Sequence, residues 1–554
     1  MKKLLIIIVI ALSIFGIYYI GFYEPEEPIE FKPFDSPYVL VETNDSINLV
    51  KYEEDAFKKL INNEKYYVPE ATLENRNVDI DLDLSTSLVT LVNREHLIKY
   101  DSISKILEIN HKVVPWDEPI KIEDGNVLIE SSLLEEYFQI GSKLNEDKST
   151  LIIKNEGFNG FKGEIKAEGY LYRKDDINEG MLRDLNLASE WKVAPVSDDW
   201  YVGYSESLAF GYIEKDKFKI SDVIEPIEEE KVVNEKIILT WDQVYSSSIG
   251  ARDIEPMSGV DVISPTWFKL NNDLGRFESF LNERYIRWAR DEGYQVWPLV
   301  SNTFGDIEMT SRFLNNVESR TRLIDDLLDV YTQHSFKGIN VDFENVYLKD
   351  RKKLTQFISE LTYAFSKEDI IVSVDVTILG GSENWSQSYN HQRIGELVDY
   401  LMVMTYDEHW ASSPVSGSVA SYGWVKSSLE ELIKIVDRNK IVMGIPLYTR
   451  IWYEEPSREK VNTMEVSSKA ITMQGQNNLL RDVGLKPIWD QEARQFYLGY
   501  IEDSRVKKIW LEEEVSIKEK AKLVNELGIS GVATWSRGFE TNNIWDVIES
   551  EVGE

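Results

Sequence analysis

The sequence predicts an α/β fold: a (β/α)8 TIM barrel with a small α+β insertion, preceded by small β-rich modules and a transmembrane helix. Three observations lead to this prediction. Beyond residue 236, apolar strand-like runs alternate with amphipathic helical runs, as in a barrel of parallel strands. Between residues 38 and 222, short alternating runs are separated by turn residues, which is typical of small β modules. The chain starts with a long apolar stretch without charge.

That N-terminal stretch predicts a membrane anchor over residues 1–23. Residues 4–23 carry no charge, and about 20 apolar residues suffice to span a bilayer. Lys2 and Lys3 should stay cytoplasmic, which sends the rest of the chain outside. A cleaved signal peptide is the alternative, but no small-x-small cleavage site precedes Glu24. We therefore expect a single-pass protein of the cell membrane with an extracellular bulk, or else a secreted protein.

The next segments are expected to position the protein and not to carry chemistry. Residues 24–37 are rich in Pro and Glu, which predicts an extended linker. Strand signals predict one β module over 38–157 and a second over 160–222. The acidic stretch 223–236 lacks a clear period and is predicted to be another linker. Because the modules show no clustered acid, base or ligand set, a fragment beginning near 235 should keep its chemistry.

The barrel is predicted over residues 237–554 from eight apolar runs separated by helical segments. Eight strands with helices between them is the count of a (β/α)8 barrel. About 80 residues separate the seventh and eighth runs, too many for one helix, so a small inserted subdomain is expected around 455–510. The eight runs are 237–241, 261–268, 294–301, 338–344, 370–377, 400–407, 440–448 and 528–535.

Composition excludes several classes of function. Lys and Arg number 61 against 96 Asp and Glu, a net charge of −35, which argues against nucleic acid as a partner. The sequence has no cysteine, so thiolate metal sites and a cysteine nucleophile are excluded. Its five histidines form no close-spaced pair typical of zinc ligands. We therefore expect no metal and no cofactor.

The fourth run carries the chemistry. In KGINVDFE (337–344) polar and apolar residues alternate strictly, so Asn340, Asp342 and Glu344 share one face of a strand and point into the barrel. Barrel interiors are normally filled by branched apolar side chains, so three polar groups there are costly. Glu344 falls at the C-terminal end, where barrel enzymes place their active sites. A solvated edge strand would also alternate, but the apolar face made of Ile, Val and Phe fits it poorly.

Four motifs resemble those of family 18 glycoside hydrolases, in that family's order. They are GINVDFE (338–344), similar to the DGxDxDxE signature, MTYD (404–407), GIPLYTRIW (444–452) and GVATW (531–535). NVYLKDR (345–351) and MTYDEHW (404–410) look more like the spore-germination and cortex-lytic branch than like chitinases. Residues 112–155 resemble copper amine oxidase N-terminal-like modules, which implies no copper chemistry. Residues 198–218 resemble an SH3-like barrel, either a spacer or a wall-binding module.

The resemblance implies roles for individual residues. Glu344 aligns with the general acid/base and Asp342 with the carboxylate that orients the substrate's acetamido group. Trp535 aligns with the floor beneath the reacting sugar, and Tyr448 and Arg450 align with a pattern at the barrel mouth. The residues expected to bind substrate are Asn340, Tyr406, Asp407, Trp535, Tyr448 and Arg450.

The same residues predict substrate-assisted catalysis. Two carboxylates on one strand face cannot flank a sugar from opposite sides, so a direct enzyme nucleophile is hard to place. The substrate's 2-acetamido oxygen would then attack, as in family 18. Two departures from the signature stand out: Lys337 replaces its first Asp and Asn340 its second. In chitinases the second Asp shares a proton with its neighbour, whereas Asn340 cannot titrate, which bears on pH profile and turnover more than on reaction type.

We therefore expect a cell-surface glycosidase that hydrolyses β-1,4 bonds of an N-acetylglucosamine-containing glycan, peptidoglycan before chitin. A chitinase-type enzyme acting on chitin is the first alternative. A non-catalytic glycan-binding envelope protein is the second, but the retained Glu344 disfavours it. An envelope scaffold with an idle barrel is the third. No protein partner is indicated.

Overall fold

The computed structural model describes residues 37–43, 46–62, 65–74, 76–146, 148–155, 158–174, 181–224, 236–246, 256–457, 463–503 and 505–553. The chain divides into two compact units. The N-terminal unit comprises 1–74 and 117–231, and the barrel unit comprises 75–116 and 232–554. The predicted anchor (1–23) lies outside the described residues, as do residues 24–36 and 225–235 of the predicted linkers. No helix of the described segments combines the length and apolarity needed to cross a membrane.

The described part of the N-terminal unit holds three sheets, of order β12-β13-β1-β2, β10-β11-β4-β3 and β16-β15-β19-β18-β17-β14-β20. Apolar side chains of the first and third sheets, among them Leu40, Ile152 and Val202, form one core. The elements are β1 (Tyr38–Glu42), β2 (Ile47–Lys51), α2 (Glu54–Lys59), β3 (Ile61–Asn62), β4 (Lys65–Pro69), η1 (Glu70–Thr72), β10 (Ile120–Glu123), β11 (Asn126–Glu130), α3 (Ser131–Phe138), β12 (Ser142–Leu144), β13 (Thr150–Ile153), β14 (Gly160–Ile165), β15 (Tyr170–Tyr172), β16 (Met181–Asp184), β17 (Glu190–Pro195), β18 (Trp200–Ser205), β19 (Phe210–Glu214), η2 (Lys215–Lys217) and β20 (Phe218–Ile224).

An antiparallel meander inside the predicted module 38–157 belongs to the barrel unit. Its strands are β5 (Asp79–Asp83), β6 (Leu88–Val92), β7 (Leu97–Asp101), β8 (Ile106–Ile109) and β9 (Lys112–Val114). Val92 and Leu97 pack against Tyr363 of a barrel helix. The guanidinium of Arg393 donates to the Asp79 carboxylate at 2.9 Å. The meander therefore buries its apolar face on the barrel.

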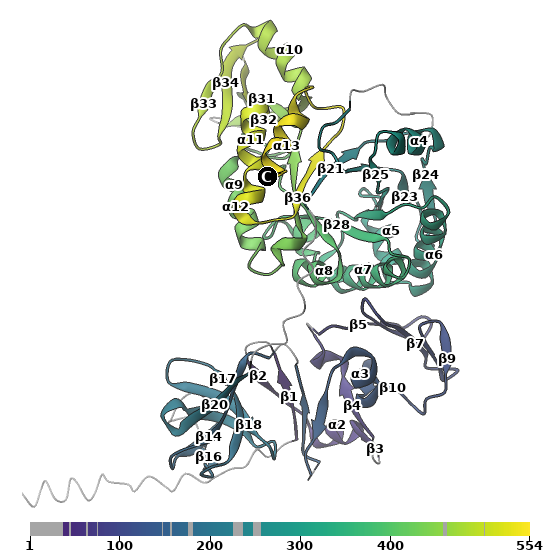
Figure 1. The fold of residues 1–554 in the computed structure, drawn as a ribbon, viewed down its shortest axis with the longest axis vertical. Coiled ribbons are helices and arrows are strands. Elements are labelled where there is room, and N and C mark those ends of the chain that lie inside the picture. The colour runs from purple at the N-terminus through teal and green to yellow at the C-terminus, as the bar shows by residue number, and fades with distance from the viewer. Residues whose placement is uncertain are drawn as a thin grey trace, which may run out of the picture. The chain divides into compact units, whose positions relative to one another are not determined.

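The barrel is a TIM-barrel-like curled sheet surrounded by helices (Figure 1). Each of the eight predicted runs contains a strand. The third run is divided at Trp297 and Pro298: β25 pairs with β22 and β26 pairs with β27. The strands are β21 (Ile237–Asp242), β22 (Val262–Pro265), β23 (Phe268–Leu270), β24 (Phe277–Ser279), β25 (Gln295–Val296), β26 (Leu299–Ser301), β27 (Gly338–Asp342), β28 (Ile371–Thr377), β29 (Tyr400–Met404), β30 (Ile441–Pro446) and β36 (Gly531–Trp535).

Amphipathic helices cover the outside of this sheet, and most of their apolar residues join one large cluster with the outward-facing strand residues. These helices are α4 (Glu283–Asp291), α5 (Ile307–Leu314), α6 (Val317–Gln333), α7 (Arg351–Ser366), α8 (His391–Leu397), α9 (Tyr422–Leu432), α11 (Glu514–Ala521), α12 (Leu523–Leu527) and α13 (Ile544–Val552). The short elements η3 (Leu348–Asp350), η4 (Glu383–Gln387) and η5 (Arg438–Lys440) lie in the connections.

The segment between β30 and β36 contains the inserted α+β subdomain, at the top of the barrel in Figure 1. Its sheet has the order β32-β31-β35-β34-β33, and it begins at Tyr448, somewhat before the predicted start. The elements are β31 (Tyr448–Pro456), β32 (Met464–Thr472), α10 (Met473–Val483), β33 (Ile488–Asp490), β34 (Gln495–Glu502) and β35 (Arg505–Trp510).

Candidate active site

The strand β27 carries the predicted catalytic face. Asn340 is fully buried and Asp342 is 7 % exposed. Glu344 follows two residues after Asp342, and Asn302 holds its backbone: the Glu344 N–H donates to Asn302 Oδ1 at 2.9 Å, and Asn302 Nδ2 donates to the Glu344 carbonyl at 2.8 Å. Sequence reasoning did not find Asn302, which has no distinctive pattern around it. These two hydrogen bonds fix the backbone position from which the Glu344 side chain projects.

Glu344 has the protonation behaviour of a general acid. Burial, followed by the charge of Asp407, raises the pKa of Glu344 to about 7. A carboxyl with that pKa is protonated in a large fraction of molecules at neutral pH, and it can therefore donate a proton to a leaving oxygen.

Asp342 lies deeper, where burial also disfavours its charged form. Burial raises the pKa of Asp342 well above its ordinary value, and the charges of Glu344 and Asp375 raise it further. Its Oδ1 atom has no hydrogen-bond partner among the described residues. A buried oxygen without a partner is costly, so this atom is the natural place for a donor from a bound substrate.

Asp375 of β28 is a third buried carboxyl that the sequence prediction missed. It is 2 % exposed and accepts a hydrogen bond from Asn340 Nδ2 at 2.7 Å. The signal was present in IIVSVDVT (370–377), where Ser373 and Asp375 interrupt an apolar strand at alternate positions.

Asn340 forms hydrogen bonds with several side chains of the barrel interior. Its Oδ1 accepts from Trp241 Nε1 at 2.8 Å, and its Nδ2 donates to Ser373 Oγ at 3.0 Å as well as to Asp375. Because its polar atoms are occupied by protein groups, the structure offers no free position on Asn340 for a substrate. These bonds give Asn340 a supporting role in the barrel interior, and its substrate-binding role stays a prediction.

Four of the remaining predicted residues gather around the barrel mouth. Tyr406 and Tyr448 lie with ring centroids 6.4 Å apart, and the Tyr448 hydroxyl donates to Asp407 at 2.6 Å. Arg450 Nε lies 3.8 Å from the same carboxylate. Burial raises the pKa of Tyr406 well above its usual range, and the negative charges of Asp375, Glu344 and Asp342 add to this rise. Tyr406 therefore stays a neutral hydrogen-bond donor facing the carboxyls.

Trp535 ends β36, the strand next to β30, and pairs with Pro446 just before Tyr448. It is half-buried, and its ring centroid lies 5.9 Å from that of Trp241. Two further indoles are more exposed, Trp385 at 43 % and Trp410 at 51 %, in the loops after β28 and β29. Large exposed aromatic faces at the C-terminal ends of barrel strands suit contacts with the flat faces of sugar rings.

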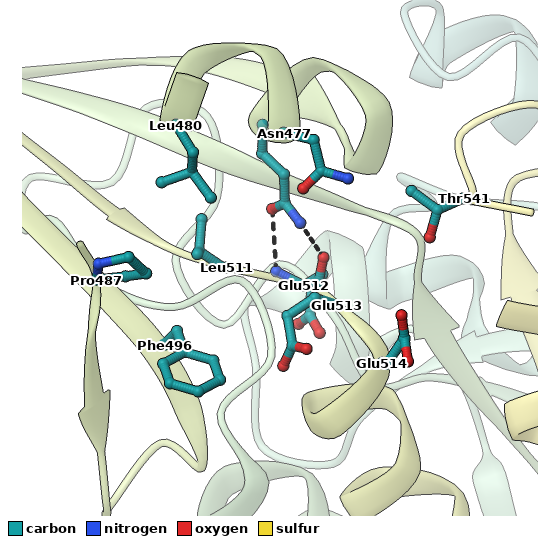
Figure 2. A pocket seen from close by; sticks show the side chains of 10 residues that line it. Asn477, Leu480, Pro487, Phe496, Leu511, Glu512, Glu513, Glu514 and Thr541 are labelled. Atoms are coloured by element: carbon teal, nitrogen blue, oxygen red, sulfur yellow. Dashed lines mark hydrogen bonds between the residues drawn. The ribbon is translucent and has the colours of Figure 1, made fainter. Parts of the chain in front are cut away.

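A cavity of about 260 Å³ lies apart from this site, in the inserted subdomain. Figure 2 shows its wall around Glu512. The side chain of Gln476 donates to the backbone carbonyl of Glu512 and accepts from its N–H. The cavity is lined by Leu480, Pro487, Phe496 and Leu511 on its apolar side. None of the predicted site residues lines it.

Within the described residues, no group of three or more His, Asp or Glu side chains is placed to hold a metal ion. The carboxyls of the barrel interior share their site with amide, hydroxyl and indole groups and do not form such a set.

Comparisons with known proteins agree with the geometry. Residues 272–540 match the model of glycosyl hydrolases family 18, and residues 47–153 match that of the copper amine oxidase N-terminal domain. The uncharacterized glycosylase YvbX of Bacillus subtilis is 29% identical over 277 residues, which are 48% of this chain and 77% of that protein. The cortical fragment-lytic enzyme of the same organism is 26% identical over 258 residues, 46% of this chain and 58% of that enzyme.

The fold has its counterpart among solved structures. The spore cortex-lytic enzyme SleL of Bacillus cereus superposes with a TM-score of 0.50 at 20% identity, over 57% of this chain and 74% of that one. This likeness concerns the fold alone. Taken with the match of residues 272–540 to the family 18 model and the carboxyls of β27, it leads to one conclusion: the barrel carries a family 18 glycoside hydrolase domain, and the protein is a glycoside hydrolase.

Proposed function

We propose that this protein cleaves β-1,4 bonds next to N-acetylglucosamine in peptidoglycan, at the outer face of the cell membrane, by substrate-assisted retaining catalysis. The observation that carries the proposal is the pair formed by Glu344 and Asp342. One carboxyl has a pKa of about 7, and the other presents a buried oxygen that no described residue hydrogen-bonds. The first suits a proton donor, and the second suits the N–H of a 2-acetamido group.

The chemistry follows from these two groups. Glu344 protonates the departing glycosidic oxygen while the substrate's acetamido oxygen attacks the anomeric carbon. The acetamido nitrogen gains positive charge in the resulting oxazolinium ion, and the Asp342 carboxylate stabilises it. Glu344, now ionised, then takes a proton from the water that opens the ring. Tyr406, Asp407 and Trp535 are the groups that we propose to hold the sugar.

One observation and one prediction favour peptidoglycan over chitin. One relative is named as an enzyme that lyses cortical fragments, and the predicted anchor would keep this chain beside the cell's own wall. The test is to incubate the purified full chain with peptidoglycan and with chitin, and to identify new reducing ends by mass spectrometry. Faster release from chitin, or release of ends other than those next to N-acetylglucosamine, would replace the proposed substrate.

The stereochemistry of the product is a separate prediction. Because the acetamido oxygen and then water attack the same carbon, two inversions should give net retention. NMR should detect the β-anomer first, before mutarotation. A substrate with a free 2-amino group at the reacting sugar should be inert, since it lacks the attacking oxygen. Initial release of the α-anomer, or brisk hydrolysis of the de-N-acetylated substrate, would contradict this mechanism.

The localisation gives a further prediction. Residues 1–23 should remain on the protein and hold it in the membrane, because the apolar stretch is long enough to span it. Fractionation of cells followed by N-terminal sequencing should find full-length protein in the membrane fraction. Mature protein in the medium with an N-terminus near residue 24 would show instead that the segment is a cleaved signal.

A further inference from the structure

Asp375 and Asp342 occupy neighbouring positions on two parallel strands. The register pairs Asn340 with Ser373 and Val341 with Val374, so the next pair along β27 and β28 is Asp342 with Asp375. Adjacent strands are about 4.8 Å apart, and side chains two positions along a strand share a face. Both carboxyls therefore point to the same side as Asn340 and Ser373, into the barrel. Both are at least nine-tenths buried.

The two carboxyls differ in their partners. Asp375 receives the amide hydrogen of Asn340 at 2.7 Å. The indole of Trp241 donates to the oxygen of that amide at 2.8 Å, and this donor fixes which end of Asn340 faces Asp375. Asp342 Oδ1 has no protein partner among the described residues. A hydrogen bond that favours the charged form thus acts on Asp375, while Asp342 keeps an oxygen available.

The surroundings cannot support two negative charges here. The charge of Glu344, after β27, raises the pKa of both carboxyls, whereas hydrogen bonds from Asn340 and Trp241 lower that of Asp375. The pair in turn raises the pKa of two nearby phenols, Tyr389 before α8 and Tyr406 after β29. No Lys, Arg or His of the described chain forms an ion pair with either carboxyl. Burial raises the pKa of both Asp342 and Asp375 well above the ordinary value. Two adjacent buried carboxyls without a cation resist double ionisation, so one proton stays with the pair.

We propose that Asp375 is the residue that takes the proton of Asp342 when substrate binds. In the free enzyme Asp342 carries the proton and Asp375 the negative charge. When the acetamido N–H reaches Asp342 Oδ1, the O–H bond of Asp342 breaks and an O–H bond forms on Asp375. The pair keeps a single negative charge, which now lies on Asp342 beside the oxazolinium. Asp375 is thus a positioning residue that acts through Asp342.

This inference rests on the proposed function, and it explains the departure at Asn340. The carboxyl that the signature places two residues before Asp342 is absent here, and a carboxyl on the next strand stands in its place. Asn340 then serves as the neutral donor that holds Asp375. Asp342 therefore still has a neighbouring carboxyl, but this carboxyl lies on β28 and not on β27.

The kinetic test uses full-length Asp375→Asn, the double variant Asn340→Asp with Asp375→Asn, and Asp399→Asn as the matched control. Asp399 lies at the opposite end of the same strands, where it accepts from the backbone N–H of Val372. On a soluble chitooligosaccharide, Asp375→Asn should lower kcat at least tenfold with KM changed less than threefold. The acidic limb of the pH profile of kcat for Asp375→Asn should be displaced by one pH unit or more, because a lone carboxyl replaces a coupled pair.

The double variant returns a carboxyl beside Asp342 and should recover at least fivefold in kcat over Asp375→Asn. Asp399→Asn should keep the wild-type pH profile. If the profile of Asp375→Asn superimposes on that of the wild type, or the double variant recovers nothing, the proposal is overturned.

Infrared difference spectroscopy tests the proton itself, even if a variant does not fold. Addition of an N-acetylglucosamine-derived thiazoline to the wild type should shift the C=O band of a protonated carboxyl, as the proton moves from Asp342 to Asp375. Asp375→Asn should lack the shift. A wild-type spectrum without any change in this band would overturn the proposal. If the band titrates in two coupled steps but no glycan is cleaved, the proposed function fails while the shared proton stands.

Discussion

Glu344→Gln should lower turnover by about 10²–10⁴-fold, the usual contribution of general acid/base catalysis, while glycan binding persists. The amide keeps the shape and the hydrogen-bonding capacity of the carboxyl, but it has no proton of suitable acidity to give to the leaving oxygen. The measurement is kcat on a chitooligosaccharide, together with the Kd of a thiazoline inhibitor. Glu278→Gln, an exposed position on β24, is the matched control and should leave both values unchanged.

The pH dependence of the wild type gives an independent check on Glu344. Its pKa of about 7 belongs to the proton donor, so the active form is the protonated one. Activity should therefore fall as pH rises above about 7, and Glu344→Gln should lose this basic limb. Near-wild-type turnover in Glu344→Gln, or a basic limb that survives the substitution, would remove Glu344 from the acid role.

The sequence was sufficient to predict the barrel because each strand carries its own pattern. The run 338–344 shows both the apolar face that packs on the helices and the polar face that makes the site. Asp375 was not predicted because its position relative to Asp342 depends on which strands are neighbours. Only the pairing of β27 with β28 brings the two carboxyls side by side. A single strand shows which side chains share a face but does not show which strand lies next to it.

The meander β5–β9 illustrates the same limit. Short strands separated by turns were expected in this region, but the partner of their apolar face was not. Val92 and Leu97 could have packed within an N-terminal module, yet they pack on Tyr363 of α7. The expectation that a fragment beginning near 235 keeps its chemistry therefore changes, because such a fragment would lack strands that are part of the barrel unit.

The contact between meander and barrel is centred on buried Arg320 of α6. The side chain has no exposed surface. Its guanidinium donates to both oxygens of Glu360 at 3.0 and 2.9 Å, to Asp81 of β5 at 2.6 Å and to the carbonyl of Leu314 at 2.6 Å. One cation thus compensates two buried carboxylates, one of which comes from the meander.

Arg320→Ala should destabilise the barrel unit by about 3 kcal/mol or more, because removing one partner of a buried ion pair costs about 3–5 kcal/mol. Residual partners keep the expected cost near the lower end: Lys353 still reaches Asp81, and Gln356 still donates to Glu360 at 2.9 Å. Arg276→Ala is the matched control, since its pair with Asp326 is exposed and should contribute no more than about 1 kcal/mol. Urea unfolding of the full chain, followed by tryptophan fluorescence, measures both.

If the unfolding midpoint of Arg320→Ala coincides with that of Arg276→Ala, the buried ion pairs of Arg320 do not stabilise the barrel unit. A clearly lower midpoint would show that the buried bonds of Arg320 to Glu360 and Asp81 stabilise the barrel unit. A fragment starting near 235 lacks Asp81, so we expect it to be less stable although it keeps every proposed catalytic group.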